Sequence, residues 1–356
     1  MSTRSFKNQP RQGAVLLAVL GLVFLLSVII VQFLRFAQFE IENQAHSSNQ
    51  DELRVKAYSA LEYTLASLAE YELMKLKLHN PRQGWGNLDI NFLIKEDDNI
   101  ELKLTITDET GKIPLRYSDQ TALENLLGGL FNEMDFTLSE ATELKDCLLD
   151  WIDDDDERRF SGAEKFDYQR EKPPYSAYNE PLSDFETLRY IRGFSKLFYD
   201  KEGTPNDHYW KFIESVSLYH NKPINLNTAS ELTLKTIVKV ENPSFSFSEI
   251  NDYLNGPDGK RGTKDDQSLK EDNALGIKQP AEPFRGKGQV KGGAEGPQPK
   301  PEEKQHYGIE ASMFKVQVLA NRGEIGYTLT VIYEYTKDSK ENSYKIIKIA
   351  ENRQFN

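Results

Sequence analysis

The sequence predicts an α+β fold in which a long N-terminal helix packs on an antiparallel sheet, with a large, mainly α-helical domain inserted between the strands. Three observations predict it. Apolar residues recur every three or four positions from Leu53 to Leu68, which is typical of one face of a helix. Apolar and polar residues alternate in residues 100–106 and 327–335, which is typical of half-buried strands. Between these strands the apolar residues repeat with a helical period.

The first forty residues contain a segment long enough to cross a membrane. Residues 12–34 are 23 consecutive positions without a charged side chain, and a helix over residues 14–34 would span roughly 30 Å, the thickness of a bilayer core. Arg4, Lys7 and Arg11 precede this segment, so the positive-inside rule predicts a single-pass inner-membrane protein with a cytoplasmic N-terminus and a periplasmic bulk. A cleaved signal peptide and a plain membrane anchor are alternatives, although the apolar run is longer than that of a signal peptide.

The rest of the chain has the composition of a soluble folded protein. The whole chain of 356 residues includes 44 basic and 56 acidic side chains, and its net charge of −12 argues against nucleic acid as a partner. With 38% hydrophobic and 28% charged residues, the chain is neither wholly disordered nor a multi-span membrane protein. Cys147 is the single cysteine, which excludes an intramolecular disulfide. The catalytic motifs HExxH, GxSxG and GxxxxGK[ST] do not occur, so we expect that the chain is not an enzyme.

The other elements follow from local pattern. The N-terminal helix should continue to about Leu78, and residues 88–94 are the predicted hairpin partner of the strand at 100–106. The sequence then predicts helices at residues 122–131, 139–152, 185–194 and 230–240, the second of them capped by Ser139. Residues 269–308 are rich in Gly, Pro and charge, which predicts a loop. Strands are predicted last, at residues 314–320, 326–336 and 343–349, in one sheet with the first strand.

Two acidic clusters are candidate calcium sites. Calcium binds six to eight oxygen atoms, mostly from carboxylates and carbonyls, and tolerates irregular loops. The first cluster follows the second predicted helix, and its candidate ligands are Asp150, Asp153, Asp155, Asp156 and Glu164. The second lies among three glycines next to Asn255, and its candidate ligands are Asp258, Asp265 and Asp266. A hydrated acidic turn and a glycine-rich loop tip are the respective alternatives.

The chain resembles a known family in several motifs that occur in order. A short basic leader that ends at Gly13, directly before the apolar helix, is similar to type IV pilin and pseudopilin leaders, which a prepilin peptidase cuts after that glycine. Ala18 stands at the fifth mature position, where most such subunits have glutamate. The segments DETGKI, DWIDDDD, GAE, PPY, FETLRYIRG and INLNTAS, with Asn179, resemble the general secretion pathway protein K family, which lacks that glutamate. Pro114, where the family tends to have Asn, and the Gly/Pro-rich loop depart from the pattern.

This resemblance and the local patterns together predict the domain organisation. The chain divides into a cleaved leader (1–13), a transmembrane and filament-core helix (14–34), the soluble part of the helix with the first strands (35–107), an inserted helical domain (108–268), the Gly/Pro-rich loop (269–308) and C-terminal strands (309–356).

The resemblance implies a minor pseudopilin of a type II secretion system, cut between Gly13 and Ala14 and methylated at the new N-terminus. Such a subunit would cap the tip of the periplasmic pseudopilus through its helical domain, with structural calcium and with other minor pseudopilins, the prepilin peptidase and the inner membrane as partners. The alternative is a membrane-anchored periplasmic binding protein, because INLNTAS also resembles helix-hairpin-helix modules that bind DNA. The segment after it lacks the hairpin glycines, which favours a structural turn.

Overall fold

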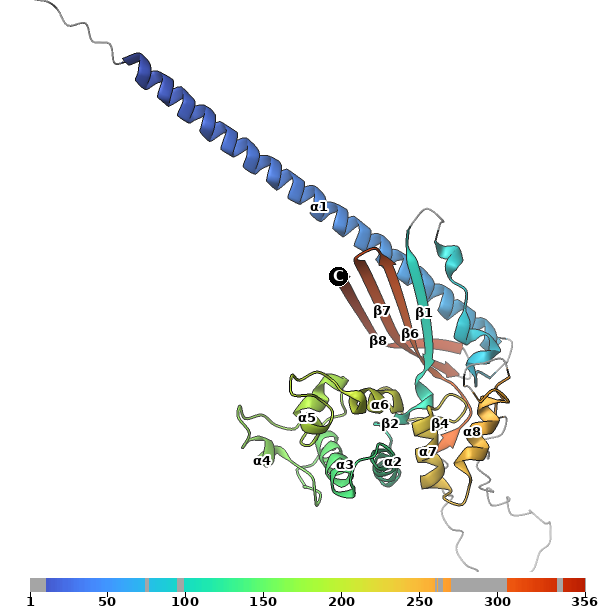
Figure 1. The fold of residues 1–356 in the computed structure, drawn as a ribbon. Helices are drawn as coiled ribbons and strands as arrows, with labels where there is room; N and C mark the ends of the chain where they lie inside the picture. Colours follow the sequence, from blue (N-terminus) through green and yellow to red (C-terminus); the bar gives the residue numbers. More distant parts are fainter. Residues whose placement is uncertain are drawn as a thin grey trace, which may run out of the picture.

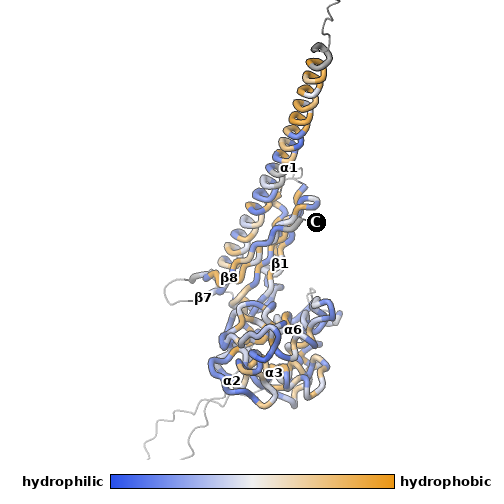
Figure 2. The backbone as a smooth tube through the Cα atoms, turned by 90° about the vertical axis from the view of Figure 1, so that its left-hand side faces the viewer, coloured by the Kyte–Doolittle hydropathy of each residue, from blue (hydrophilic) through white to orange (hydrophobic). Residues whose placement is uncertain are grey.

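The computed structural model describes residues 11–73, 77–94, 99–259, 261, 265–269, 306–337 and 342–355. Its first element, α1 (Arg11–Leu73), is a single 63-residue helix that extends far beyond the rest of the chain (Figure 1). Within α1, residues Val15–Ile41 form a stretch apolar and long enough to cross a membrane, and none of it is buried. Figure 2 shows this apolar stretch at the end of α1 remote from the folded part. The predicted leader, residues 1–13, lies mostly outside the described residues.

The second half of α1 packs on the sheet. The apolar stripe is buried as predicted, with Leu53, Ala57 and Leu68 fully inaccessible and Leu61 4% exposed. The helix ends at Leu73, so the predicted end near residue 78 is wrong. Leu78 is instead in extended chain, where its carbonyl accepts a hydrogen bond of 2.7 Å from the amide of Ala311.

The sheet is antiparallel, with the order β1-β6-β7-β8, and the α+β class is confirmed. It consists of β1 (Glu101–Asp108), β6 (Met313–Arg322), β7 (Ile325–Lys337) and β8 (Asn342–Phe355). β1 pairs with β6 along its whole length, from Glu101↔Asn321 to Asp108↔Phe314. The two predicted groups of strands therefore share one sheet. Side chains of β6 and β7 form a core with α1 that includes Phe314, Leu329 and Tyr333.

The hairpin strand predicted at residues 88–94 is wrong. The segment contains one short 3₁₀ turn, η3 (Asn91–Leu93), and no strand; two further turns, η1 (Pro81–Gln83) and η2 (Trp85–Asn87), precede it. Apolar residues of this region serve packing instead, since Trp85 and Ile90 are buried in the sheet core. The segment is tied to α1, because the Lys56 ammonium donates a hydrogen bond of 2.6 Å to the Leu93 carbonyl.

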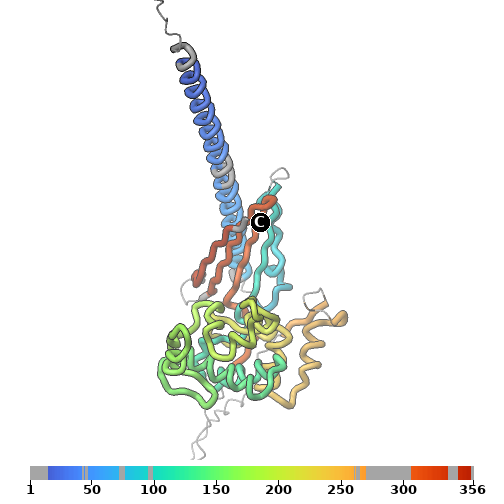
Figure 3. The backbone as a smooth tube through the Cα atoms, turned by 60° about the vertical axis from the view of Figure 1, so that its left-hand side comes forward, coloured from blue at the N-terminus to red at the C-terminus, as the bar shows by residue number. Residues whose placement is uncertain are grey.

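A helical domain lies at the end of the sheet away from the exposed part of α1 (Figure 3). It contains α2 (Gln120–Glu133), α3 (Leu138–Ile152), α4 (Lys165–Tyr168), η5 (Phe185–Tyr190), α5 (Phe194–Leu197), α6 (Asp207–Ser215), α7 (Glu231–Glu241) and α8 (Phe247–Asn255). Its core centres on aromatic rings, such as Phe131 stacked on Phe212 at 5.6 Å. Two predictions here are wrong. Thr137, not Ser139, caps α3, because Glu140 completes a capping box with it, and residues 185–190 form a 3₁₀ helix.

Two parallel strand pairs join the helical domain to the sheet. β2 (Ile113–Pro114) pairs with β3 (Val216–Ser217), and β4 (Ile224–Asn225) pairs with β5 (Tyr307–Gly308). The predicted loop at 269–308 is therefore wrong at its end, because Tyr307 and Gly308 are paired and Tyr307 is buried. Residues 270–305 lie outside the described residues.

Candidate calcium sites

The first acidic cluster begins in the last turn of α3. Asp150 is completely buried there, and its carboxylate accepts a hydrogen bond of 2.7 Å from Arg159 Nη1. The backbone amide of Arg159 also donates to both Asp150 oxygens, at 3.3 and 3.2 Å. Gly162 lies so close that a Cβ built on it would be 1.8 Å from Asp150 Oδ2. Asp150 thus closes the loop that follows α3.

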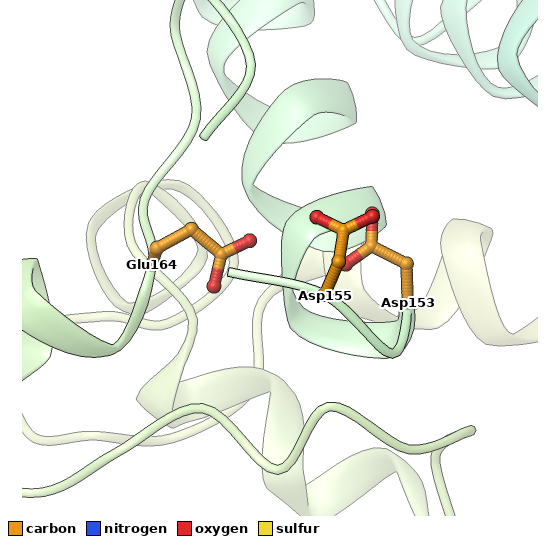
Figure 4. Close-up of side chains that lie close together, drawn as sticks. All are labelled: Asp153, Asp155 and Glu164. Carbon is orange, nitrogen blue, oxygen red and sulfur yellow. The ribbon is translucent and has the colours of Figure 1, made fainter. Parts of the chain in front are cut away.

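Three carboxylates meet on this loop. Oxygen atoms of Asp153, Asp155 and Glu164 lie within 4.8 Å of one another. Figure 4 shows the Asp153 and Asp155 carboxylates side by side, while that of Glu164 points toward them from the segment before α4. Like charges at this separation repel unless a proton or a cation compensates them.

Glu164 has the features of a metal ligand. It is 2% exposed, and within the described residues neither carboxylate oxygen has a hydrogen-bond partner. Burial, together with the charges of Asp150 and Asp153, raises the pKa of the Glu164 carboxyl to about 7. A buried carboxylate without partners is costly, so an ion that supplies positive charge would stabilise this arrangement.

The two carboxylate oxygens of Asp153 have different surroundings. Its Oδ2 atom accepts from Arg159 Nη1 at 2.5 Å, while Oδ1 is buried and has no partner in the described part of the chain. Burial raises the pKa of Asp153, the charges of Asp155 and Asp154 add to this, and Arg159 opposes it. One oxygen of Asp153 is therefore free to face a cation.

Asn179 is a further oxygen donor that the sequence alone did not indicate as a ligand. Its Nδ2 donates to the Asp155 carbonyl at 2.7 Å and to Asp156 Oδ1 at 3.1 Å, which orients the amide. Its Oδ1 is buried and has no hydrogen-bond partner among the described residues. Asn179 has a φ of 50°, a left-handed conformation that asparagine adopts more readily than most residues. An asparagine two residues before Pro181 is the sequence signal for such a position.

The donor set fits calcium. The unpartnered buried oxygens come from two carboxylates and one amide, Asp153, Glu164 and Asn179, which are hard ligands of the kind that calcium prefers. Of the five predicted ligands, Asp153, Asp155 and Glu164 are brought together. Asp150 and Asp156 lie beside them but use oxygens in hydrogen bonds to Arg159 and Asn179.

The second acidic cluster follows α8. Oxygen atoms of Asp258, Asp265 and Asp266 lie within 4.8 Å of one another, and the Asp258 amide donates to Asp265 Oδ2 at 2.9 Å. Gly256 allows the turn, since its φ is 66° and a Cβ there would lie 2.3 Å from the Asp265 carbonyl oxygen. Asn255 Oδ1 is buried and unpartnered in the part of the chain that the structure describes. All three predicted ligands of this cluster are therefore adjacent, beside one amide oxygen.

The INLNTAS segment forms a structural turn. Asn225 donates a hydrogen bond to Asp108, Asn227 donates one of 3.1 Å to the Leu269 carbonyl, and Ser230 caps α7. These side chains are thus engaged within the chain, which offers no support for the alternative of a DNA-binding module.

A similarity to known proteins covers the first strand, the first part of the helical domain and the first acidic cluster. Residues 88–201 match the family described as Type II secretion system (T2SS), protein K. This part of the chain, which we name the protein K domain, is similar to that family. The predicted resemblance to the protein K family is confirmed, and the matched residues include the cluster of Asp153, Asp155 and Glu164 with Asn179.

Two further similarities extend beyond the protein K domain. The chain is 26% identical over 208 residues to the type II secretion system protein K of Klebsiella pneumoniae, an alignment that covers 54% of this chain and 61% of that relative's length. The fold is similar to a chain in the crystal structure of the GspK-GspI-GspJ complex from the type 2 secretion system of enterotoxigenic Escherichia coli. That match has a TM-score of 0.51 and 14% identity, and it covers 84% of this chain and 99% of the other.

Proposed function

We propose that the chain is a minor pseudopilin of a type II secretion system that sits at the tip of the periplasmic pseudopilus and caps it. The observation that carries the proposal is the arrangement of three parts. An exposed apolar helix, a sheet packed on its second half, and the protein K domain follow one another along the molecule (Figure 1).

The apolar part of α1 supports storage in the inner membrane and later assembly. Residues Val15–Ile41 are unburied and apolar, so the segment is suited either to lipid or to similar helices. Cleavage after Gly13 would free Ala14 as the N-terminus, and Ala18 leaves this helix without the acidic side chain that pairs with a neighbour's ammonium. A subunit without that side chain needs no preceding neighbour, which suits the first position in a filament.

The helical domain supports the capping role. It lies past the end of the sheet that is remote from the apolar helix, where a further subunit would have to pack (Figure 3). The helical domain has a hydrophobic core of its own, formed by buried apolar side chains drawn from between Ile113 and Leu254 and by Tyr307. A folded unit of this size in that place excludes a successor by its volume.

Partners and calcium follow from the same proposal. The similar structure is a complex with GspI and GspJ, and we infer that this chain assembles with other minor pseudopilins. Calcium bound by Asp153, Asp155, Glu164 and Asn179, and a second ion near Asp258, Asp265 and Asp266, would fasten the two loops of the helical domain. The ions would act as structural links.

The N-terminus of the mature protein tests the proposal. Mass spectrometry of the chain isolated from membranes of its own host should find an N-methylated Ala14 as the first residue. The matched variant Gly13→Val should retain the leader and fail to join filaments. A wild-type chain that begins at Met1, or that is cut near residue 40, contradicts the proposal.

The place in the filament requires a second measurement. Antibodies against the helical domain should label one end of isolated pseudopili, and the chain should co-purify with other pilin-like subunits. Label along the whole filament would contradict the capping role.

A further inference from the structure

One edge of the sheet pairs with no further strand among the described residues. β8 forms the edge opposite β1 and, among the described strands, pairs only with β7. Every residue in 345–353 is exposed, on both faces of the strand. An edge of this length offers a row of backbone donors and acceptors to another chain unless something covers it.

The opposite edge shows what a protected edge looks like in this protein. β1 is flanked by η2, and the neighbouring segment buries Trp85 and Ile90 against the sheet core. β8 has no proline, and its single irregularity is a bulge at Ile347, where the register shifts opposite Ile332 and Tyr333. Beyond the bulge, the Lys348 side chain reaches the helical domain and donates a hydrogen bond of 3.2 Å to the Ser183 carbonyl. Residues 349–353 form a regular, exposed ladder next to β7.

The hairpin between β6 and β7 fixes which backbone groups of this ladder point outward. Gly323 and Glu324 form a two-residue turn, so Arg322 and Ile325 are a hydrogen-bonded pair. Odd-numbered residues of β7 from Ile325 to Val331 thus bond to β6, and even-numbered ones bond to β8. Through the register of β8, the N–H and C=O groups of Ile349, Glu351 and Arg353 face away from the sheet.

Side-chain hydrogen bonds link the same stretch of β8 to α1. Glu351 accepts a hydrogen bond of 2.5 Å from the Tyr58 hydroxyl and one of 3.3 Å from Arg54, and Arg353 donates one of 3.3 Å to Gln50. These contacts fix which part of α1 lies beside this edge.

On the face that α1 shares, the side chains of this edge are mixed, because Glu351 and Arg353 bond to α1 whereas two isoleucines are apolar. Ile349 and Ile346 are opposite the core residues Val331 and Tyr333, so they lie on that face, yet they are 47% and 48% exposed. Val55 of α1 is 64% exposed. An extended segment with alternating apolar residues would cover Ile346 and Ile349 while its backbone pairs with the edge.

We propose that residues 349–353 of β8 receive an extended segment of a neighbouring pilin-like subunit as a fifth strand. This inference rests on the proposed function and names one of the contacts it requires. β8 lies against α1 at residues 50–58, shortly after the exposed apolar stretch ends at Ile41. A subunit that packs its own helix on that stretch therefore brings its folded part beside β8.

Photo-crosslinking in cells that contain the native secretion system tests this inference. p-Benzoylphenylalanine replaces Ala350, whose side chain is exposed, in the full-length chain. We expect a crosslink that peptide mapping places in a strand of another pilin-like subunit. Adding Ile349→Pro, which removes one outward N–H but none that bonds to β7, should lower the yield at least about fivefold. Ile349→Thr keeps that N–H and should lower it less.

Two controls separate the possible outcomes. The melting temperature of each variant shows whether β8 remains folded. The crosslink of the chain that carries only the probe at Ala350 tests strand addition even if a variant fails to fold. A crosslink to a second copy of this chain, to a helix of the partner, or to nothing overturns strand addition. The same probe at Leu26, which is 48% exposed in α1, reports helix packing. A crosslink at Leu26 without one at Ala350 leaves the pseudopilin proposal standing, whereas loss of both refutes that proposal too.

Discussion

Asn225 donates a hydrogen bond of 2.8 Å from its side-chain nitrogen to Oδ2 of Asp108, and this contact joins the helical domain to the last residue of β1. The same amide nitrogen donates to the His79 carbonyl at 3.1 Å, so one side chain links three segments. Thr228 donates a further bond of 2.6 Å to Asp108, and Thr110 donates to its other oxygen through the backbone at 2.9 Å. Asp108 is the acceptor at the centre of the junction.

Replacing Asp108 by Asn should loosen this junction. An amide nitrogen in place of one carboxylate oxygen would face a donor, so at least one buried hydrogen bond is lost without replacement. We expect a loss of about 1–3 kcal/mol in the free energy of unfolding, measured by urea denaturation. Asp154→Asn, at an exposed position of the acidic loop, is the control and should change little. Equal stability of the two variants would contradict the role of Asp108.

Asp108 should also make stability depend on pH. Burial raises the pKa of its carboxyl from 3.8 to about 6, against the lowering effect of its hydrogen-bond donors. The folded state thus holds this proton more tightly than the unfolded state does. Its contribution is complete below about pH 3.8 and is lost as the pH rises through about 6. Compared with Asp108→Asn, the wild type should lose stability over that interval, in melts without calcium. Parallel curves for the two proteins would refute this assignment.

Calcium should stabilise the protein through Asp155 and Glu164. Thermal melts with calcium should show a higher melting temperature than melts with a chelator, by an amount that grows with ion concentration. Asp155→Ala and Glu164→Gln should weaken the binding measured by calorimetry at least about tenfold, because each removes a charged ligand. Asp154→Asn should bind as the wild type does. No heat of binding and no thermal shift would leave the cluster as a hydrated acidic loop.

The affinity for calcium should fall as the pH is lowered through about 7. The metal requires a deprotonated Glu164, and the pKa of this carboxyl is raised to about 7 by burial and by Asp150 and Asp153. Calorimetric titrations at pH 8 and pH 6 should therefore differ, with weaker binding at pH 6. In Glu164→Gln the residual binding should depend less on pH over that range. An equal dependence in both proteins would place the titrating group elsewhere.

The sequence predicted those parts of the fold that depend on local periodicity. The stripe from Leu53 to Leu68 and the alternation in β7 indicated a helix and a strand, because burial on one face repeats with the period of the element. Residues 88–94 alternate in the same way, yet Ile90 packs in the core of the sheet without any strand pairing. Alternation of apolar and polar residues indicates that one side of a segment is buried. Whether the segment is also a strand depends on whether another strand lies beside it to form backbone hydrogen bonds.

The candidate site was predictable only in its acidic residues. Proximity in sequence suggested five ligands in the first cluster, but Arg159, which is not acidic, decides that Asp150 closes the loop. Asn179 reaches the cluster from 23 residues beyond Asp156 through a left-handed turn. Such contacts depend on tertiary folding, which spacing along the chain does not determine.

Gly162→Ala should disrupt the first acidic loop. A methyl group at this position would lie 1.8 Å from Asp150 Oδ2, and Asp150 cannot move without losing its bonds to Arg159. We expect a loss of about 2–4 kcal/mol in the free energy of unfolding, together with weaker calcium binding. Gly128→Ala is the matched control, since its nearest neighbour would be Lys145 Cδ at 3.6 Å and alanine favours a helix. Unchanged stability of Gly162→Ala would show that the loop is not packed as described.

Ala18→Glu should impair assembly if the subunit occupies the first position of a filament. A first subunit has no preceding neighbour whose terminal ammonium could pair with the new carboxylate, so an unpaired charge would enter the apolar layer at a cost of about 2.5–3.5 kcal/mol. Secretion of a native substrate and recovery of the chain with other pilin-like subunits should both decrease. Ala18→Leu, which adds bulk without charge, should behave as the wild type does. If Ala18→Glu assembled normally, residue 18 would face a partner's ammonium, and the chain could not be the terminal subunit.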